Sequence, residues 1–233
     1  MREEQGARTR SFRAWAGLSP AKGAPRMTDT GLVHGPLGGN VAHVCVDMQN
    51  LFAHGSDWAM PWLERVLPRI EAIAAAHAED TVFTRFIPLD RPGEGKGTWK
   101  RYYERWAGMT RERLASGQIE LVPALARFVP PAAVIDKTVY SPWLEGGPQS
   151  GLEGLLAARG ADTIVVTGGE TDVCVLGTVL GAVDRGLRVI LVRDALCSSS
   201  DETHDASLAL YHRRYGQQVE PVTTEELLEA WRR

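Results

Sequence analysis

The chain has 233 residues, of which 44% are hydrophobic and 24% are charged, and its formal net charge is −3. These values are typical of a globular chain that can bury a full core, and they argue against a disordered or fibrous protein. The charge balance is not basic enough for a nucleic-acid-binding protein, and no apolar run approaches the length of about 20 residues that a membrane-spanning helix needs.

Charge is spread unevenly along the chain. The first 26 residues carry six basic and two acidic side chains and show no hydrophobic periodicity. We therefore expect residues 1–38 to form a poorly ordered basic extension and residues 39–233 to form one folded domain. The extension lacks the apolar segment of a secretory signal, and Glu3 and Glu4 argue against a transit peptide. Translation from Met27 is an alternative explanation.

The body of the chain alternates two kinds of segment. Short apolar runs rich in β-branched residues predict strands over Val41–Met48, Thr81–Ile87, Ala133–Lys137, Thr163–Thr167, Arg188–Asp194 and Gln218–Val222. Helical spacing and helix-end signals predict helices over Pro61–Ala78, Thr98–Ser116, Gly151–Arg159, Asp172–Arg185, Asp201–Tyr215 and Thr224–Arg232. Six strands that alternate with helices predict a doubly wound, three-layer α/β/α fold with a mainly parallel sheet.

The carboxyl ends of the strands are where an open parallel sheet binds its ligands. The first predicted strand ends at Asp47, the third ends at Lys137, and the fourth leads to Cys174 in the first turn of the next helix. Each residue also has an ordinary explanation: a loop carboxylate, a solvated lysine and a core thiol. The arrival of all three at one edge is much more specific and favours a catalytic site.

Cys174 stands out among the three cysteines. A helix N-terminus and a neighbouring ammonium group both lower the pKa of a thiol, so we expect a reactive nucleophile. Cys45 lies within a predicted strand and Cys197 in a polar loop, and we expect both to be structural. An odd number of cysteines does not form a disulfide framework, which favours a reducing, cytoplasmic location.

Three stretches resemble the isochorismatase-like cysteine hydrolase superfamily: Val46–Asn50, Asp136–Trp143 and Val166–Val175. The resemblance extends from about Val41 to Val222. It implies the sheet order 3-2-1-4-5-6 and an Asp-Lys-Cys triad that maps onto Asp47, Lys137 and Cys174.

The resemblance also implies a mechanism. Cys174 would attack a carbonyl carbon and form a thioester acyl-enzyme, while Asp47 would transfer protons and Lys137 would hold Asp47 ionised. The backbone N–H groups of Glu170 and Cys174 would form an oxyanion hole. The peptide bond between Gly169 and Glu170 would be cis.

The loop after the second strand departs from one branch of the superfamily. Nicotinamidases carry an Asp-x-His metal site there, whereas this loop has Asp90 without a histidine. One carboxylate does not make such a site, so we expect no metal ion and no other cofactor. The six histidines show no ligand spacing either: His34, His43, His54, His77, His204 and His212.

The presence of a thiol favours cleavage of a C–N bond, in an amide or ureide, of a small planar substrate. Trp99, Tyr102 and Trp106 are spaced as an aromatic stripe on a helix, which would either pack on the core or another subunit or act as a lid. A lid would offer a basic residue, Lys100, Arg101 or Arg105, to a substrate carboxylate. The predicted substrate-binding side chains are Phe52, Trp99, Tyr103, Tyr140 and Trp143.

Two other functions stay open. One is an isochorismatase-type hydrolase that cleaves a vinyl ether, and the other is a non-catalytic family member that acts as a scaffold. A nucleotide binder is disfavoured because no Gly-x-Gly-x-x-Gly motif follows the first strand. We expect a small-molecule substrate and a homo-oligomer, either a dimer or a tetramer, with no nucleic-acid or membrane partner.

Overall fold

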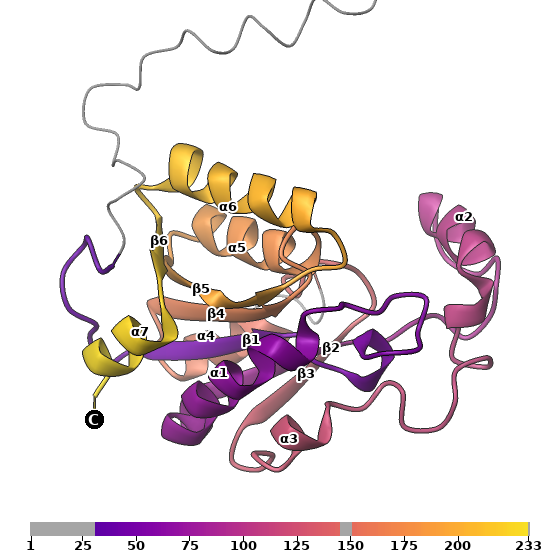
Figure 1. The fold of residues 1–233 in the computed structure, drawn as a ribbon, viewed down its shortest axis with the longest axis horizontal. Coiled ribbons are helices and arrows are strands. Elements are labelled where there is room, and N and C mark those ends of the chain that lie inside the picture. Colours follow the sequence, from indigo (N-terminus) through magenta and orange to yellow (C-terminus); the bar gives the residue numbers. More distant parts are fainter. Residues whose placement is uncertain (1–30, 145–150, 233) are drawn as a thin grey trace, which may run out of the picture.

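A six-stranded parallel sheet forms the centre of the protein, seen in a computed structural model that describes residues 31–144 and 151–232 (Figure 1). The strand order is β3-β2-β1-β4-β5-β6, and every neighbouring pair is parallel. The strands are β1 (Val41–Val46), β2 (Thr81–Phe86), β3 (Ala133–Lys137), β4 (Thr163–Gly169), β5 (Arg188–Cys197) and β6 (Val219–Val222). The predicted α/β fold and the predicted strand order are confirmed.

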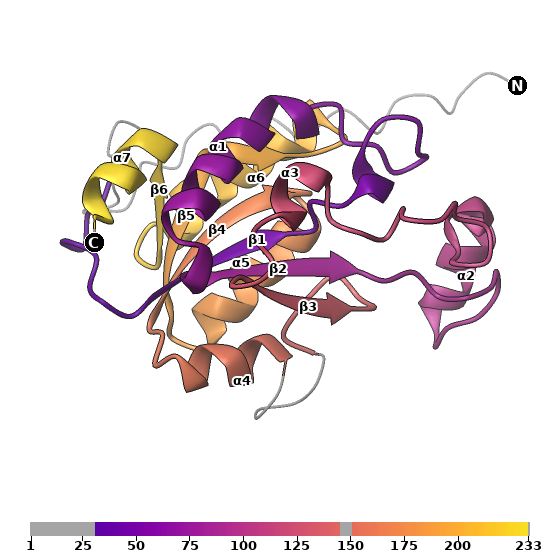
Figure 2. The same cartoon turned by 90° about the horizontal axis from the view of Figure 1, so that it is seen from below.

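Helices cover both faces of the sheet (Figures 1 and 2). On one face lie α1 (Leu63–Ala76), α3 (Pro123–Ala126) and α7 (Thr224–Ala230). On the other face lie α4 (Gly151–Ala158), α5 (Cys174–Asp184) and α6 (Asp201–Tyr215). Hydroxyl side chains cap the first turns of α6 and α7. The Ser200 hydroxyl accepts a hydrogen bond from the N–H of Thr203, and Thr223 forms a capping box with Glu226.

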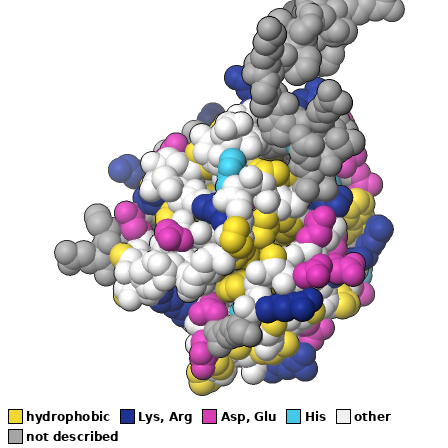
Figure 3. Space-filling view, turned by 90° about the vertical axis from the view of Figure 1, so that its left-hand side faces the viewer, with side chains coloured by type: hydrophobic (Ala, Val, Ile, Leu, Met, Phe, Trp, Pro, Cys, Tyr) yellow, Lys and Arg dark blue, Asp and Glu magenta, His cyan; other side chains and the backbone are white. Residues whose placement is uncertain are grey.

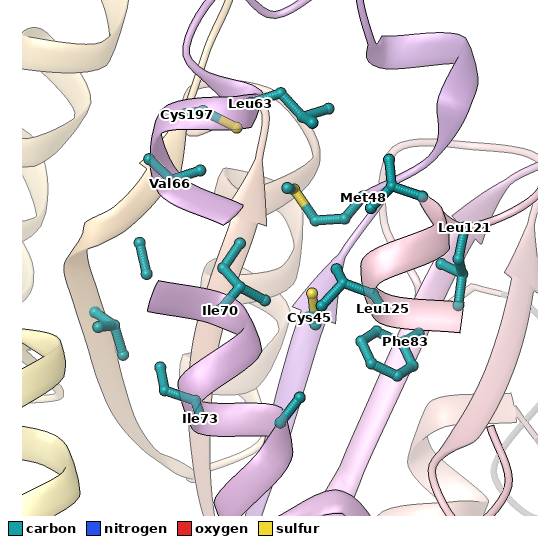
Figure 4. Close-up of a cluster of buried hydrophobic side chains, with 14 of the residues drawn as sticks. Cys45, Met48, Leu63, Val66, Ile70, Ile73, Phe83, Leu121, Leu125 and Cys197 are labelled. Atoms are coloured by element: carbon teal, nitrogen blue, oxygen red, sulfur yellow. The ribbon is translucent and has the colours of Figure 1, made fainter. Parts of the chain in front are cut away.

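Two hydrophobic clusters stabilise these layers because strand side chains alternate between the faces. On β1, Val41 and Cys45 pack under α1, whereas Ala42, Val44 and Val46 pack under α4 and α5. Figure 4 shows the first cluster, in which Leu63, Val66, Ile70 and Ile73 of α1 point toward the sheet. All six positions of β1 are buried, as expected for a central strand covered on both sides.

The central strand also buries one polar side chain. His43 makes hydrogen bonds with the hydroxyls of Thr81 on β2 (3.1 Å) and Thr167 on β4 (2.8 Å). Burial, together with the charge of His77, lowers the pKa of His43 to about 3. His43 therefore joins three strands as a neutral group, in agreement with the absence of ligand spacing in the sequence.

Several helices and strands begin or end at residues other than those predicted. The predicted helix Thr98–Ser116 is only α2 (Thr98–Arg105), followed by the short 3₁₀ helix η3 (Ala107–Met109) and turns. Gly108 is a poor helix former, and the buried Met109 draws the chain back to the core. Strand β5 extends past Asp194 because Leu196 and Cys197 pair with Gly168 and Gly169 after a register shift between β4 and β5.

Residues 31–38 are the described part of the expected extension, and several of them contact the body of the protein. The Gly31 N–H donates to the Pro221 carbonyl oxygen, and the Arg188 guanidinium donates to the carbonyl oxygens of Gly35 and Pro36. Leu32 and Leu37 pack against the first hydrophobic cluster. Residues 1–30 lie outside the described residues, so the rest of this expectation stays a prediction.

The two ends of the sheet differ in character. At the carboxyl ends, the long connection from β2 to β3 projects outward and carries α2 (Figure 2). At the opposite end, beside β6 and α7, acidic and basic side chains are interspersed with hydrophobic ones (Figure 3). The aromatic residues of the β2–β3 connection therefore lie at the end where the predicted catalytic residues are expected.

Strands β1 and β4 approach each other unusually closely at Gly168. Its φ is +98°, and an added Cβ would lie 2.1 Å from the carbonyl oxygen of Val46. Since that atom belongs to the backbone of the central strand, neither strand can yield without moving the residues that follow, Asp47 and Gly169.

We predict that Gly168→Ala destabilises the protein by about 3 kcal/mol, because the methyl group overpacks the strand pair and the backbone is strained. Urea unfolding measures this. Gly38→Ala is the matched control, because a Cβ there meets no atom within 4 Å, and it should unfold like the wild type. Equal stability of the two variants would contradict the close approach.

Candidate active site

Asp47, Lys137 and Cys174 meet at the carboxyl edge of the sheet. Asp47 directly follows β1, Lys137 is the last residue of β3, and Cys174 is the first residue of α5. Asp47 has a φ of +51°, a left-handed conformation that Asp tolerates better than most residues and that turns the chain at the end of the strand. The structure thus brings together the three residues that the sequence placed at one edge.

Lys137 reaches Asp47 from two strands away, because β2 lies between β3 and β1. Its side chain crosses the end of β2, where its Nζ atom lies 5.0 Å from the centre of the Phe86 ring. The same Nζ is 2.6 Å from the Asp47 Oδ2 atom, 3.4 Å from the Cys174 Sγ atom and 3.2 Å from the carbonyl oxygen of Val139. Lys137 therefore contacts both of the other two residues of the site.

A neighbouring strand fixes the orientation of the Asp47 carboxylate. The Thr84 hydroxyl on β2 donates a 2.6 Å hydrogen bond to the Asp47 Oδ1 atom, and the Asp47 N–H donates to the Thr84 carbonyl oxygen at 3.2 Å. One carboxylate oxygen is thus held by Thr84 and the other by Lys137. Because the whole pair is buried, each contact is worth more than it would be in water.

Burial sets the protonation of the site. It raises the pKa of the Cys174 thiol, and the charge and hydrogen bonding of Asp47 add to this, while the Lys137 ammonium only partly opposes them. For Lys137, burial lowers the pKa, but the interactions with Asp47 and Cys174, including a hydrogen bond to each, outweigh it and the net direction is upward. The expected lowering of the thiol pKa is therefore wrong: the resting site holds an ammonium group and a neutral thiol.

The turn between β4 and α5 holds Cys174 against the end of the sheet. The peptide bond between Gly169 and Glu170 is cis, at the position that the family resemblance implied. The carbonyl oxygen of Glu170 accepts hydrogen bonds from the N–H groups of Val173 and Val175, the residues on either side of Cys174. Gly169 packs closely, since a Cβ there would lie 2.3 Å from the Met60 sulfur and would require that side chain to shift.

A cavity of about 250 Å³ opens onto Cys174, a size that suits a small ligand. Aromatic rings make up most of its wall, together with two carboxylates and the hydroxyl of Ser199. The lining residues are Phe52, Asp57, Trp58, Phe86, Tyr102, Trp106, Tyr140, Glu170, Val173, Cys174 and Ser199.

Only part of the predicted substrate-binding set lines this cavity. Phe52 and Tyr140 do, whereas Trp99 packs behind Tyr140 at a ring distance of 4.9 Å, and Tyr103 is fully buried. Trp143 lies in the second hydrophobic cluster, so its prediction as a substrate contact is corrected. Its indole N–H donates to the Thr178 carbonyl oxygen at 2.9 Å.

Sequence reasoning missed the central ring of the pocket. Trp58 lies within 6.3 Å of the ring centres of Phe52, Phe86, Tyr102 and Trp106. It belongs to the loop between η1 (Asn50–Phe52) and α1. This loop is part of the connection that leads from Asp47, at the end of β1, to α1. Its place soon after the end of the first strand was the signal that could have identified it.

Asp90, the one residue of the loop that corresponds to a metal ligand of the nicotinamidases, contacts a basic side chain. Asp90 lies 3.3 Å from the Arg111 guanidinium, and within residues 31–144 and 151–232 no group of three His, Cys, Asp or Glu side chains could hold a metal ion. In the same ranges, no helix is long and apolar enough to cross a membrane. The homo-oligomer and the cytoplasmic location stay predictions.

The Lys137–Asp47 ion pair gives a prediction for stability. Lys137→Met leaves the Asp47 carboxylate buried without its cation and should cost about 3–5 kcal/mol of unfolding free energy. Adding Asp47→Asn removes that charge and should recover part of the loss, so urea unfolding of both single variants and the double variant should show strong coupling. Additive costs would contradict a direct interaction.

The upward pKa of Cys174 gives a prediction for reactivity. Since a thiol reacts as its thiolate, the rate at which iodoacetamide alkylates Cys174 should keep rising with pH through pH 9, without an earlier plateau. Lys137→Met should slow alkylation further, because Lys137 lowers this pKa. Mass spectrometry of the Cys174 peptide measures the rate, and a plateau below pH 8 would contradict the direction.

Comparisons with known proteins agree with this fold. A cysteine hydrolase from Pseudomonas syringae pv. phaseolicola has a TM-score of 0.70 at 24% identity, with 87% of this chain and 97% of that chain covered. The uncharacterized isochorismatase family protein YwoC of Bacillus subtilis is 35% identical over 122 residues, which are 52% of this chain and 63% of YwoC.

A second curated relative is maleamate amidohydrolase of Pseudomonas putida KT2440, 34% identical over 65 residues, which cover 28% of this chain and 30% of that enzyme. The chain therefore matches less than two thirds of the length of either curated relative. The family profile of the isochorismatase domain, by contrast, matches residues 41–226. This range includes all six strands and the Asp47, Lys137 and Cys174 cluster, so the chain belongs to the isochorismatase domain family.

Proposed function

We propose that the protein is a cysteine hydrolase that cleaves a C–N bond, in an amide or ureide, of a small substrate. The observation that carries the proposal is the contact of one ammonium group, Lys137 Nζ, with both the Asp47 carboxylate and the Cys174 thiol, and Cys174 lines an aromatic cavity. A thiol that is merely structural needs neither partner. The similarity to a maleamate amidohydrolase supports the choice of a C–N bond.

The first half-reaction follows from the protonation of the site. Cys174 is a neutral thiol at rest, so Asp47 takes the thiol proton as the sulfur attacks the carbonyl carbon and the S–C bond forms. The N–H groups of Glu170 and Cys174 would stabilise the resulting oxyanion at the start of α5. The C–N bond then breaks, Asp47 returns the proton to the leaving nitrogen, and a thioester remains on Cys174.

The second half-reaction consumes one water molecule. Asp47 removes a proton from the water as its oxygen adds to the thioester carbon, and the C–S bond breaks when the tetrahedral intermediate collapses. The released thiolate recovers its proton from Asp47, so that one amide and one water give one acid and one amine. Lys137 stays charged throughout, and it stabilises both the carboxylate and the transient thiolate.

Thr84 and Lys137 position Asp47 for these transfers. Each holds a different oxygen of the carboxylate, at 2.6 Å in both cases. The steps above assign every bond change and proton transfer to Asp47, Lys137, Cys174 or a backbone N–H group. The proposal therefore routes no step through a metal ion.

We predict that the wild type releases ammonia from at least one member of a panel of small amides, ureides and carbamoyl amino acids. Cys174→Ala should lose this activity by at least a thousandfold and keep its thermal unfolding midpoint within a few degrees, because only a sulfur atom is removed. Cys45→Ala is the matched control, since Cys45 is buried in the core, and it should stay active.

Two results would overturn the proposal. Turnover that survives in Cys174→Ala would remove the nucleophile. No ammonia from any compound, together with cleavage of a vinyl ether, would favour the isochorismatase-type reaction, and inactivity toward both classes would favour a non-catalytic protein.

A further inference from the structure

The charges around the aromatic cavity are arranged in an unexpected way. Two carboxylates, Asp57 and Glu170, line it, and the lining includes no Lys or Arg. The basic residues on α2, which the sequence offered to a substrate carboxylate, are exposed: Lys100, Arg101 and Arg105. Arg105 lies 5.3 Å from the centre of the Trp106 ring but is not part of the lining.

The positive charge closest to the reacting sulfur is already neutralised. Lys137 is buried beneath the cavity, and its ammonium group contacts the Asp47 carboxylate at 2.6 Å. The Asp47 carboxylate thus balances Lys137, and the two remaining ionisable carboxyl groups give the cavity a negative potential. An anionic substrate would meet repulsion there instead of an ion pair.

Glu170 has no cationic partner in the cavity. Its Oε1 atom accepts a 3.1 Å hydrogen bond from the N–H of Ser199. Burial raises the pKa of Glu170, and the Ser199 hydrogen bond only partly opposes this. A bound cation would supply the missing charge partner and stabilise the ionised carboxylate.

The aromatic rings provide a second means of binding a cation. The ring of Trp58 lies 5.8 Å from those of Phe86 and Tyr102 and 6.3 Å from that of Trp106, so that rings from three chain segments converge on one space. The faces of such rings carry negative electrostatic potential and attract ammonium groups, and a set of them binds alkylated ammonium groups well.

We propose that the cavity selects substrates that carry a cationic, alkylated ammonium group next to the scissile amide. The ammonium group would lie among the rings around Trp58, with Glu170 and Asp57 as its counter-charges, while the amide carbonyl reaches Cys174. This inference rests on the proposed function and names its substrate class.

The first test measures binding to the Cys174→Ala protein, which does not depend on turnover. Betaine amide, 3,3-dimethylbutanamide and succinamate carry a cationic, a neutral and an anionic group, and the first two have nearly the same shape. Titration followed by tryptophan fluorescence or calorimetry should give at least about tenfold tighter binding of betaine amide than of its neutral isostere, with succinamate weakest.

Variants identify the groups responsible for this preference. Glu170→Gln and Asp57→Asn, each in the Cys174→Ala background, should reduce the ratio of cation to neutral affinity by at least threefold. Asp57 is exposed, so its substitution leaves the fold intact. Glu225→Gln on α7, in a separate surface pocket beside Arg69 and Asp194, is the matched control and should leave the ratio unchanged.

The outcomes separate this inference from the proposed function. Equal affinity for the cation and its isostere, tighter binding of succinamate, or no binding of any of the three would overturn the cationic preference. So would a Cys174-dependent turnover in which kcat/KM is higher for succinamate than for betaine amide. Preferential binding of betaine amide with no ammonia release from any amide would instead overturn the proposed function and leave the preference standing.

Discussion

The buried ion pair between Lys137 and Asp47 is the interaction on which the geometry of the site depends. A charge in the interior is tolerated only when it is paired and hydrogen-bonded, and here both conditions require a particular arrangement of strands. Lys137 on β3 must cross the end of β2 to reach a residue that follows β1, so the order β3-β2-β1 is needed as well as the residues. The same ammonium group contacts the Cys174 sulfur, which ties α5 to this edge.

The structure separates the groups that we propose to react from the groups that would surround a ligand. Asp47, Lys137 and Cys174 lie at the ends of core elements, where neighbouring strands restrict each of them. Most of the aromatic cavity wall comes instead from two connections, one after β1 and the other between β2 and β3, and the segments after β3, β4 and β5 add Tyr140, Glu170 and Ser199. Trp58 joins the two connections through its contacts with Tyr102 and Trp106. The chemistry is therefore fixed by the sheet, and the shape of the cavity is fixed by contacts between loops.

The sequence was sufficient to predict the fold and the residues that lie at the ends of strands and at the start of a helix. The alternation of apolar runs and helical segments predicted the fold, and the position of Asp47, Lys137 and Cys174 at the ends of their elements predicted that they meet. Thr84 could not be found, because its contact depends on strand register. Trp143 was predicted to contact the substrate, yet the absence of a side chain at Gly181 on α5 leaves space for its ring in the core. The thiol pKa was wrong in direction because the depth of burial cannot be inferred from a helix start.

The two loops that meet at Trp58 have a consequence for how members of such a family can diverge. Insertions or substitutions between β2 and β3 alter the cavity without disturbing any strand pairing, since that connection projects away from the sheet (Figure 2). A new selectivity can therefore arise while the proposed reaction is preserved, and related chains with the same Asp-Lys-Cys cluster need not share a substrate. In this architecture, related proteins can therefore keep the same mechanism while they differ in metabolic role.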